Sequence, residues 1–239
     1  QDSFWDKGNR AYEDAAEATA LRRLLPLRGK RMLELGAGTG RNTLRYQDFK
    51  QIVLLDYSTT QLEKAYKRLG VKNRYRYVAA DIYRLPFMPG SFDCATMIRT
   101  LHHMVNPSLA LSQVHDSFIH KAVFILEYAN KRNIKAILRY WLKKQTWNPF
   151  SLEPVEFAPL NFDFHPKAVR DWMTQCQFIN ERQLTVSHFR LSFLKNHVSY
   201  KVLARLDALL QPTGQLFQLS PSVFLRAHAE GELPAQLQD

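Results

Sequence analysis

Short apolar runs alternate with amphipathic segments along most of this 239-residue chain. The run Ala122-Val123-Phe124-Ile125-Leu126 has the length and the β-branched and aromatic content of a buried strand. Strands that alternate with helices build a parallel sheet that is covered on both faces. The pattern therefore predicts an α/β protein with a doubly wound, mostly parallel sheet of about seven strands. We expect these strands at residues 31–35, 51–56, 74–80, 92–98, 122–126, 182–188 and 223–225.

The amphipathic segments carry the start and stop signals of helices. Alanine and leucine recur at helical spacing in the first segment, and Pro26 stops that pattern. Ser58 is a good N-cap for a later helix, which Gly70 ends. Proline stands in the first turn of two more helices. We expect helices at residues 9–25, 41–48, 58–69, 166–176 and from 107 onward.

Two connections are longer than a compact fold requires. They are residues 128–164, after the fifth strand, and residues 189–221, after the sixth strand. Long connections in compact domains often form lids or binding loops. We therefore predict a single domain over residues 1–239 in which these two segments are lid insertions that cap the sheet.

Candidate chemistry concentrates in the stretch Leu33-Glu34-Leu35-Gly36-Ala37-Gly38-Thr39-Gly40. A strand ends there in glycines at alternate positions, which let the backbone turn sharply beneath a ligand. Asp56 lies 20 residues after Gly36, the interval at which an acid in a nucleotide-binding βαβ unit meets a ribose hydroxyl. The stretch predicts a nucleoside-bearing cofactor on a Rossmann-like sheet. A dinucleotide is disfavoured, because Arg41 stands where its fingerprint needs a third glycine.

Read from Glu34, the pattern E-x-G-x-G-x-G resembles motif I of the class I S-adenosylmethionine-dependent methyltransferases. Three further stretches resemble later motifs of that family in the same order, namely Asp56-Tyr57-Ser58, Asp81-Ile82 and Ser91-Phe92-Asp93. The likeness covers roughly residues 30–127, about one compact α/β unit. A domain whose glycines serve only helix–strand packing and an NAD(P)-dependent enzyme are the alternatives.

The resemblance implies S-adenosylmethionine as cofactor and S-adenosylhomocysteine as product. It implies that Asp56 accepts from the ribose hydroxyls, that Asp81 accepts from the adenine amino group and that Glu34 attracts the methionine ammonium. Arg99 stands where many members have a small or apolar residue, and the methionine carboxylate would give it the partner that a buried arginine needs. The implied cofactor-binding residues are Tyr12, Glu34, Gly36, Ala37, Gly38, Gly40, Asp56, Tyr57, Asp81, Ile82 and Arg99.

A pair of histidines follows the fourth strand in Leu101-His102-His103, which resembles the post-strand loop of the quinone-biosynthesis methyltransferases, members of the small-molecule type. A histidine can remove a proton from an O–H or N–H acceptor near neutral pH, so His103 is our candidate catalytic base. The alternative is that the pair shapes the pocket without proton transfer. Glu127, at the end of the fifth strand, either contacts substrate or caps the next helix.

Composition narrows the range of partners and compartments. The net charge is +11, but the basic excess is spread over both halves of the chain, which argues against a nucleic-acid partner. Cys94 and Cys176 have no metal-ligand spacing, so we expect two core thiols, no metal, no disulfide and a reducing cytoplasm. No apolar run has the length of a membrane span, and Gln1–Lys7 do not have the pattern of a signal peptide.

The segment Asn130–Lys144 combines an apolar helical face with six basic residues and no acidic one. Such a helix can lie on an anionic membrane or hold an acidic substrate. We expect instead a lid helix whose apolar face packs on the domain and whose basic side chains lie in water. Peripheral membrane contact through residues 130–144 is the alternative.

The two insertions are rich in aromatic residues, which suit an apolar or aromatic acceptor but equally suit an ordinary cap core. We predict a methyltransferase that acts on a small, apolar or aromatic acceptor. An RNA methyltransferase and a catalytically inactive cofactor-binding partner subunit are the alternatives, and the oligomeric state stays open. The tryptophans and phenylalanines are Trp141, Trp147, Phe150, Phe157, Phe162, Phe164, Phe189, Phe193 and Phe217.

Overall fold

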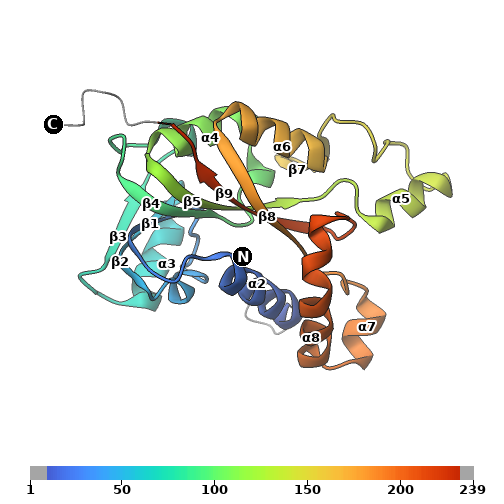
Figure 1. The fold of residues 1–239 in the computed structure, drawn as a ribbon. Coiled ribbons are helices and arrows are strands. Elements are labelled where there is room, and N and C mark those ends of the chain that lie inside the picture. Colours follow the sequence, from blue (N-terminus) through green and yellow to red (C-terminus); the bar gives the residue numbers. More distant parts are fainter. Residues whose placement is uncertain (1–9, 232–239) are drawn as a thin grey trace.

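The computed structural model of the chain describes residues 10–231; residues 1–9, with the polar Gln1–Lys7, and residues 232–239 lie outside the described residues. Its centre is a seven-stranded sheet in the order β3-β2-β1-β4-β5-β9-β8 (Figure 1). The predicted fold, a mostly parallel α/β sheet of seven strands, is confirmed. The strands are β1 (Gly29–Leu35), β2 (Phe49–Asp56), β3 (Tyr75–Ala79), β4 (Phe92–Met97), β5 (Phe118–Ala129), β8 (Phe178–Val186) and β9 (Ser222–Ala229).

The direction in which the sheet grows reverses at β1. Strands β2 and β3 are added on one side of β1, and β4 and β5 on the other, all of them parallel. Strand β9 is antiparallel to both of its neighbours, β5 and β8. Ligands of doubly wound sheets bind outside the carboxyl ends of the strands at such a switch point. The glycine turn that follows β1 therefore lies where this topology places a ligand.

Helices cover both faces of this sheet. Helices α4 (Pro107–Asp116) and α6 (Pro166–Gln175) lie on one face, and α2 (Ala11–Leu24) and α3 (Thr59–Leu69) lie on the other (Figure 1). Buried apolar side chains of the strands pack with α4 and α6 in one cluster. Those on the opposite face pack with α3 in a second cluster, and with α2 and α8 (Tyr200–Leu210) in a third. This packing holds the carboxyl ends of the strands in place.

The helix predicted over residues 41–48 is wrong. Only a 3₁₀ turn, Thr43–Arg45, forms there, because β2 begins two residues earlier than predicted and leaves little room for a helix. The Thr43 hydroxyl also donates a hydrogen bond to the buried Glu34 carboxylate over 2.6 Å. This bond turns the segment back toward the end of β1.

Both predicted insertions are present, one after β5 and the other after β8, which are the fifth and sixth strands of the main sheet along the chain. The first contains the predicted helix and also a two-stranded hairpin that the sequence did not predict, and the second contains two helices. The hairpin strands pair with each other in a separate small sheet. The elements of the insertions are α5 (Ile134–Trp141), β6 (Val155–Ala158) and β7 (Asn161–Asp163) in the first, and α7 (Ser192–His197) and α8 in the second.

Helix α5 does not lie as predicted, because its apolar face is not packed on the domain. Ile134, Leu138 and Trp141 are 54%, 49% and 67% exposed, respectively. The helix is anchored at its first turn, where the Ile134 N–H donates to the Leu219 carbonyl over 2.9 Å, and its later turns extend away from the sheet (Figure 1). Within residues 10–231, every helix is too short or too polar to cross a membrane.

Candidate active site

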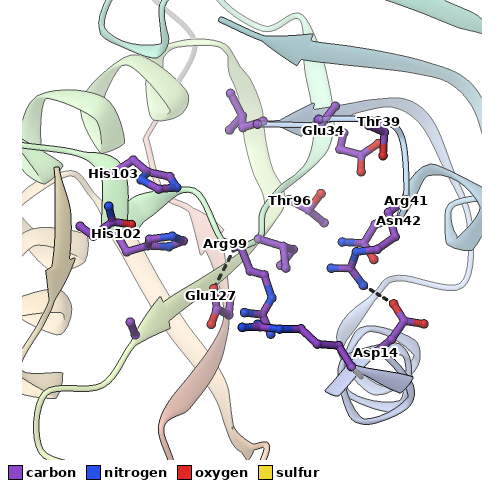
Figure 2. Close-up of a pocket in the computed structure, with 18 of the residues that line it drawn as sticks. Asp14, Glu34, Thr39, Arg41, Asn42, Thr96, Arg99, His102, His103 and Glu127 are labelled. Carbon is purple, nitrogen blue, oxygen red and sulfur yellow. Dashed lines mark hydrogen bonds and ion pairs between the residues drawn. The ribbon is translucent and has the colours of Figure 1, made fainter. Parts of the chain in front are cut away.

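A cavity of about 820 Å³ opens at the carboxyl ends of β1, β4 and β5, at the switch point of the sheet. Strand β1 contributes Glu34 and the glycine turn, and β5 contributes Glu127. Figure 2 shows His102 and His103 on one side of this pocket, and Glu34 and Thr39 on the other. The motifs that lie far apart in the sequence therefore meet around a single space.

The backbone of the glycine turn faces the cavity with no side chain in the way. Gly38 has a φ of 54°, which glycine adopts readily, and a Cβ at this position would meet no atom within 4 Å. Gly36, with a φ of 66°, serves packing as well, because a Cβ there would overlap the Thr100 side chain. Gly36, Ala37 and Gly38 all line the cavity. The open space over Gly38 fits a nucleoside cofactor that lies against the backbone.

Asp56 ends β2 beside this turn. One carboxylate oxygen accepts a hydrogen bond from the Gly38 N–H over 2.8 Å, and the other accepts from the Ser58 N–H over 2.9 Å. The spacing of Gly36 and Asp56 in the sequence therefore does correspond to neighbours in space. The carboxylate ties the turn to β2, although Asp56 itself is not among the residues that line the cavity.

The remaining residues that the resemblance assigns to the cofactor lie beyond the cavity wall. The Asp81 carboxylate accepts from the Tyr83 N–H over 2.9 Å and lines a second, smaller hollow. Ile82 is buried, and Tyr57 is 82% exposed. Gly40 has a φ of 72° and is buried beneath the turn. Their contacts with a cofactor stay predictions.

Tyr12 is not part of the cavity. It is 2% exposed, its hydroxyl donates to the Asp207 carboxylate over 2.8 Å, and the same oxygen accepts from the Phe189 N–H over 2.9 Å. These bonds join α2 to the insertion after β8. The Tyr12 hydroxyl is thus satisfied inside the protein, and its predicted role in cofactor binding stays a prediction.

Arg99 lines the cavity but is paired with an acid that the sequence analysis did not consider. Its Nε donates to the Glu17 carboxylate over 2.6 Å, and its Nη2 contacts the same oxygen. The other oxygen of Glu17 accepts from Arg41 over 2.6 Å. Burial alone would raise the pKa of Glu17, but the charges of Arg99 and Arg41 lower it to about 2. Arg99 therefore has a partner within the protein, and its predicted pairing with the methionine carboxylate stays a prediction.

Glu127 binds the backbone of Arg99. One carboxylate oxygen accepts from the Arg99 N–H over 2.9 Å, and the other accepts from the Ser222 hydroxyl over 2.5 Å. Arg99 itself has a φ of 54°, which is uncommon for a residue with a side chain. Glu127 therefore lines the cavity and fixes an unusual turn after β4, and it caps no helix.

Glu34 is an ionisable group on the glycine side of the cavity. Glu34 is only 4% exposed, and its carboxylate accepts a hydrogen bond from the Thr43 hydroxyl. Burial raises the pKa of Glu34 to about 7, although the hydrogen bond from Thr43 and the charge of Arg41 oppose this. A cation in the cavity would favour the ionised form of this carboxylate.

The two histidines differ in what they can do. Burial, together with the charges of His103 and Arg99, lowers the pKa of His102 to about 3, so its ring is neutral near pH 7. The Nδ1 of His103 lies 3.0 Å from the Leu160 carbonyl oxygen. A carbonyl only accepts, so Nδ1 carries the hydrogen, and the neutral ring keeps a lone pair on Nε2. This arrangement suits the predicted proton acceptor.

The sequence analysis missed several charged residues of the cavity wall, among them Arg10, Asp163 and Arg190. Arg10 precedes α2, Asp163 ends β7 and Arg190 follows β8. Burial raises the pKa of Asp163 to about 6, with the charge of Arg190 opposing and that of Glu127 adding to the effect. A usable signal existed for Arg190 alone, because β8 runs parallel to β5 and its carboxyl end falls on the same edge of the sheet.

The predicted aromatic wall is not what surrounds the cavity. Of the nine tryptophans and phenylalanines in the insertions, Phe157 lines it. Trp141, Phe193 and Phe217 are 67%, 70% and 62% exposed, and Phe164 belongs to the main core. The lining is instead rich in charged side chains, Arg10, Asp14, Glu34, Arg41, Arg68, Arg99, Glu127, Asp163 and Arg190.

Fold and cavity together define a doubly wound α/β protein with a nucleoside-type site at its switch point. Residues 33–126 match the family model for a methyltransferase domain. In agreement with its motifs, this segment is a methyltransferase domain of the class I S-adenosylmethionine-dependent type. S-adenosylmethionine is the cofactor of that family.

Individual relatives show how far the likeness extends. A demethylmenaquinone methyltransferase of Clavibacter sepedonicus is 34% identical over 94 residues, which are 39% of this chain and 38% of that protein. A 27-O-demethylrifamycin SV methyltransferase of Amycolatopsis mediterranei is 31% identical over 109 residues, 42% of this chain and 40% of the relative. The chain thus spans about two fifths of the length of these curated relatives.

The fold extends beyond the segment that matches in sequence. The solved structure of a SAM-dependent methyltransferase from Thermotoga maritima superposes with a TM-score of 0.68 at 19% identity. That superposition covers 95% of this chain and 94% of the other. At this identity the likeness shows a shared fold and says nothing of a shared acceptor.

Proposed function

We propose that the chain transfers a methyl group from S-adenosylmethionine to a small-molecule acceptor. The observation that carries this proposal is the meeting, in one cavity, of the open glycine turn at Gly38 and the acid–base groups His103 and Asp163. When bound, the cofactor supplies a methyl group on a positively charged sulfonium. The residues of the chain bind it, position the acceptor and exclude water, and such positioning supplies much of the rate in a direct displacement.

At the cofactor end, the turn at Gly38 lies beneath the bound molecule, and Asp56 accepts from the ribose hydroxyls in charge-assisted hydrogen bonds. Glu34 attracts the methionine ammonium, which draws this carboxyl toward its ionised form. Tyr57 and Asp81 follow β2 and β3 on the same edge of the sheet, where they suit the adenine.

At the acceptor end, His103 takes the proton that a hydroxyl or amine acceptor loses. Its Nε2 lone pair is available because Nδ1 donates to the Leu160 carbonyl. Asp163 is a second candidate for this step, because a carboxyl whose pKa is about 6 is ionised near pH 7 and can accept a proton.

We further propose an acceptor shape, a domain organisation and a compartment. Phe157 lines the cavity and supports an acceptor with an apolar or aromatic ring. We assign residues 1–239 to a single methyltransferase domain, with residues 128–164 and 189–221 as caps over the acceptor. The free, buried thiols of Cys94 and Cys176 suit a reducing cytoplasm.

Methyl transfer from cofactor labelled on the methyl group tests this function. We expect label in small molecules of a metabolite extract, no label in total RNA, and a large loss of transfer in the His103→Asn and Asp163→Asn double variant. Label in RNA would favour the RNA methyltransferase. Intact cofactor binding without transfer to either pool would favour an inactive partner subunit.

A further inference from the structure

We propose that the acceptor carries an anionic group, a carboxylate or a phosphate, which the Arg190 guanidinium binds inside the cavity. This inference rests on the proposed methyltransferase function and specifies the class of its acceptor. Arg190 lines the cavity, four residues after the end of β8. A guanidinium presents a planar set of donors that matches the oxygens of both anions.

The Arg190 side chain is a half-buried cation with a buried Nε, and it forms no ion pair with any residue that the structure describes. Its Nε is shielded from solvent and has no hydrogen-bond partner. Within residues 10–231 its guanidinium takes part in no ion pair, although it stands in a wall that contains several acids. Burial and the nearby charge of Arg99 both lower the pKa of Arg190, which means that the site disfavours its positive charge. A bound anion relieves that cost.

Two of the acids near Arg190, Glu127 and Glu17, are engaged by other groups. Both oxygens of Glu127 accept hydrogen bonds, from the Arg99 N–H and the Ser222 hydroxyl. Glu17 is held by Arg99 and Arg41. Asp163 forms no ion pair with Arg190, although the charge of Arg190 acts on it. The positive charge of Arg190 is therefore directed at the contents of the cavity.

The position of Arg190 assigns it to the acceptor and not to the cofactor. The glycine turn follows β1, whereas Arg190 follows β8 at the far edge of the sheet, with β4, β5 and β9 in between. Arg190 thus enters the cavity from the side of the insertions, near Asp163 of the hairpin. An acceptor anchored there has its nucleophilic atom directed into the cavity, toward the cofactor side.

Calorimetric titration with small aromatic probes tests this assignment. Benzoate and phenyl phosphate serve as anions, benzamide serves as the neutral isostere of benzoate, and each is titrated with and without saturating S-adenosylhomocysteine. We expect benzoate to bind about tenfold tighter than benzamide, the size of effect typical of a hydrogen bond to a charged group. Arg190→Gln should abolish this preference and leave the affinity for S-adenosylhomocysteine unchanged. Arg205→Gln, which removes an exposed arginine of α8, should change neither.

Three results would overturn the proposal: no preference for either anion in the wild type, a preference that survives in Arg190→Gln, or a loss of S-adenosylhomocysteine affinity in that variant. The last result would assign Arg190 to the cofactor carboxylate. Failure of the methyltransferase function itself looks different, because the wild type would then not bind S-adenosylhomocysteine. The titrations without it would still show the anion preference of Arg190.

A second, independent observation concerns the exposed face of α5. Ile134, Leu138, Trp141 and Leu142 recur at helical spacing and are all about half or more exposed, while Ala136 and Ile137 on the other side are buried. Four basic side chains on the same segment are exposed, Lys135, Arg139, Lys143 and Lys144. Lys131 does not join them, because it is buried and its ammonium binds carbonyl oxygens of residues 151 and 153.

We also propose that this face of α5 docks on an anionic phospholipid surface. The charge of this segment is entirely positive, since residues 130–152 contain no acidic residue, and it therefore complements an anionic surface. Tryptophan and leucine beside lysine and arginine are the composition of helices that lie in a membrane interface. The helix also extends away from the sheet (Figure 1), and the apolar side chains on this face are exposed.

Sedimentation with lipid vesicles tests the docking. We expect the protein to sediment with phosphatidylcholine vesicles that contain phosphatidylglycerol at low salt, and to be released at high salt. Lys135→Glu and Leu142→Ser should each weaken binding about fivefold or more. Lys201→Glu and Leu209→Ser, at exposed positions of α8, are the matched controls and should bind as the wild type does. Protein that stays in the supernatant, or controls that fail equally, would overturn the docking.

Discussion

The guanidinium of Arg99 and the carboxylate of Glu17 form a buried ion pair across the cavity wall, with Arg99 Nε 2.6 Å from Glu17 Oε1. The pair joins the segment after β4 to α2, and Arg41 adds a second cation from the glycine side. Arg99, which the sequence assigned to the cofactor, is therefore part of an ion-pair network that fixes α2 beside the site. A buried pair of this kind is costly to break from one side.

Replacement of Glu17 by glutamine tests the strength of this frame. The folded pKa of Glu17, about 2, lies below its ordinary value of 4.5, so its contribution is present above pH 4.5 and lost as the pH falls toward 2. We expect Glu17→Gln to lower the free energy of unfolding by about 3 kcal/mol at pH 7. Urea unfolding between pH 2 and 7 measures this difference, which should shrink below pH 4.5.

The exposed Glu63 of α3 supplies the control, and Glu63→Gln should change the free energy of unfolding by less than about 0.5 kcal/mol. A difference between wild type and Glu17→Gln that stays constant down to pH 2 would contradict the ion pair.

Gly38 and Gly70 provide a matched test of the glycine turn. Both have a positive φ, 54° and 73°, and at both a Cβ would meet nothing within 4 Å, but only Gly38 lines the cavity. Alanine should cost each position about 1–2 kcal/mol of stability through backbone strain. Only Gly38→Ala should also weaken S-adenosylhomocysteine binding, by about tenfold. Equal affinities in the two variants would mean that the cofactor does not lie over Gly38.

His102 should stay neutral over most of the acid range, because burial and the charges of His103 and Arg99 lower its pKa to about 3. Its ring resonances in an NMR titration should not move between pH 8 and pH 5. A histidine with a depressed folded pKa loses its contribution to stability as the pH falls from 6.5 toward 3, so His102→Gln should reduce the acid sensitivity of the fold. A midpoint near 6.5 for His102 would show that it is solvated and not buried.

The sheet was predictable because each of its strands carries a local signal. Buried strands such as β2 are near-continuous apolar runs, and Ser58 and Gly70 mark both ends of α3 in the sequence. The helix predicted after Gly40 failed because local propensity was overruled by a tertiary hydrogen bond, from Thr43 to the buried Glu34.

The site was predictable only where its chemistry lies in a short motif. Gly36, Gly38 and Asp56 follow from spacing, but Glu17 lies 82 residues before Arg99, and no local pattern links the two. Arg190 and Asp163 come from insertions whose course depends on packing and not on periodicity. Amphipathicity likewise showed that α5 has an apolar face and could not show that the face is left exposed.

Calorimetry with S-adenosylhomocysteine, on the wild type and on Asp56→Ala, tests the central claim most directly. We expect saturable one-to-one binding to the wild type and binding that is about 10- to 100-fold weaker in Asp56→Ala, because charge-assisted hydrogen bonds to the ribose are lost. Asp116→Ala, at an exposed position of α4, should bind as tightly as the wild type. No heat of binding in the wild type, or an Asp56→Ala affinity equal to it, would contradict a cofactor site at the glycine turn.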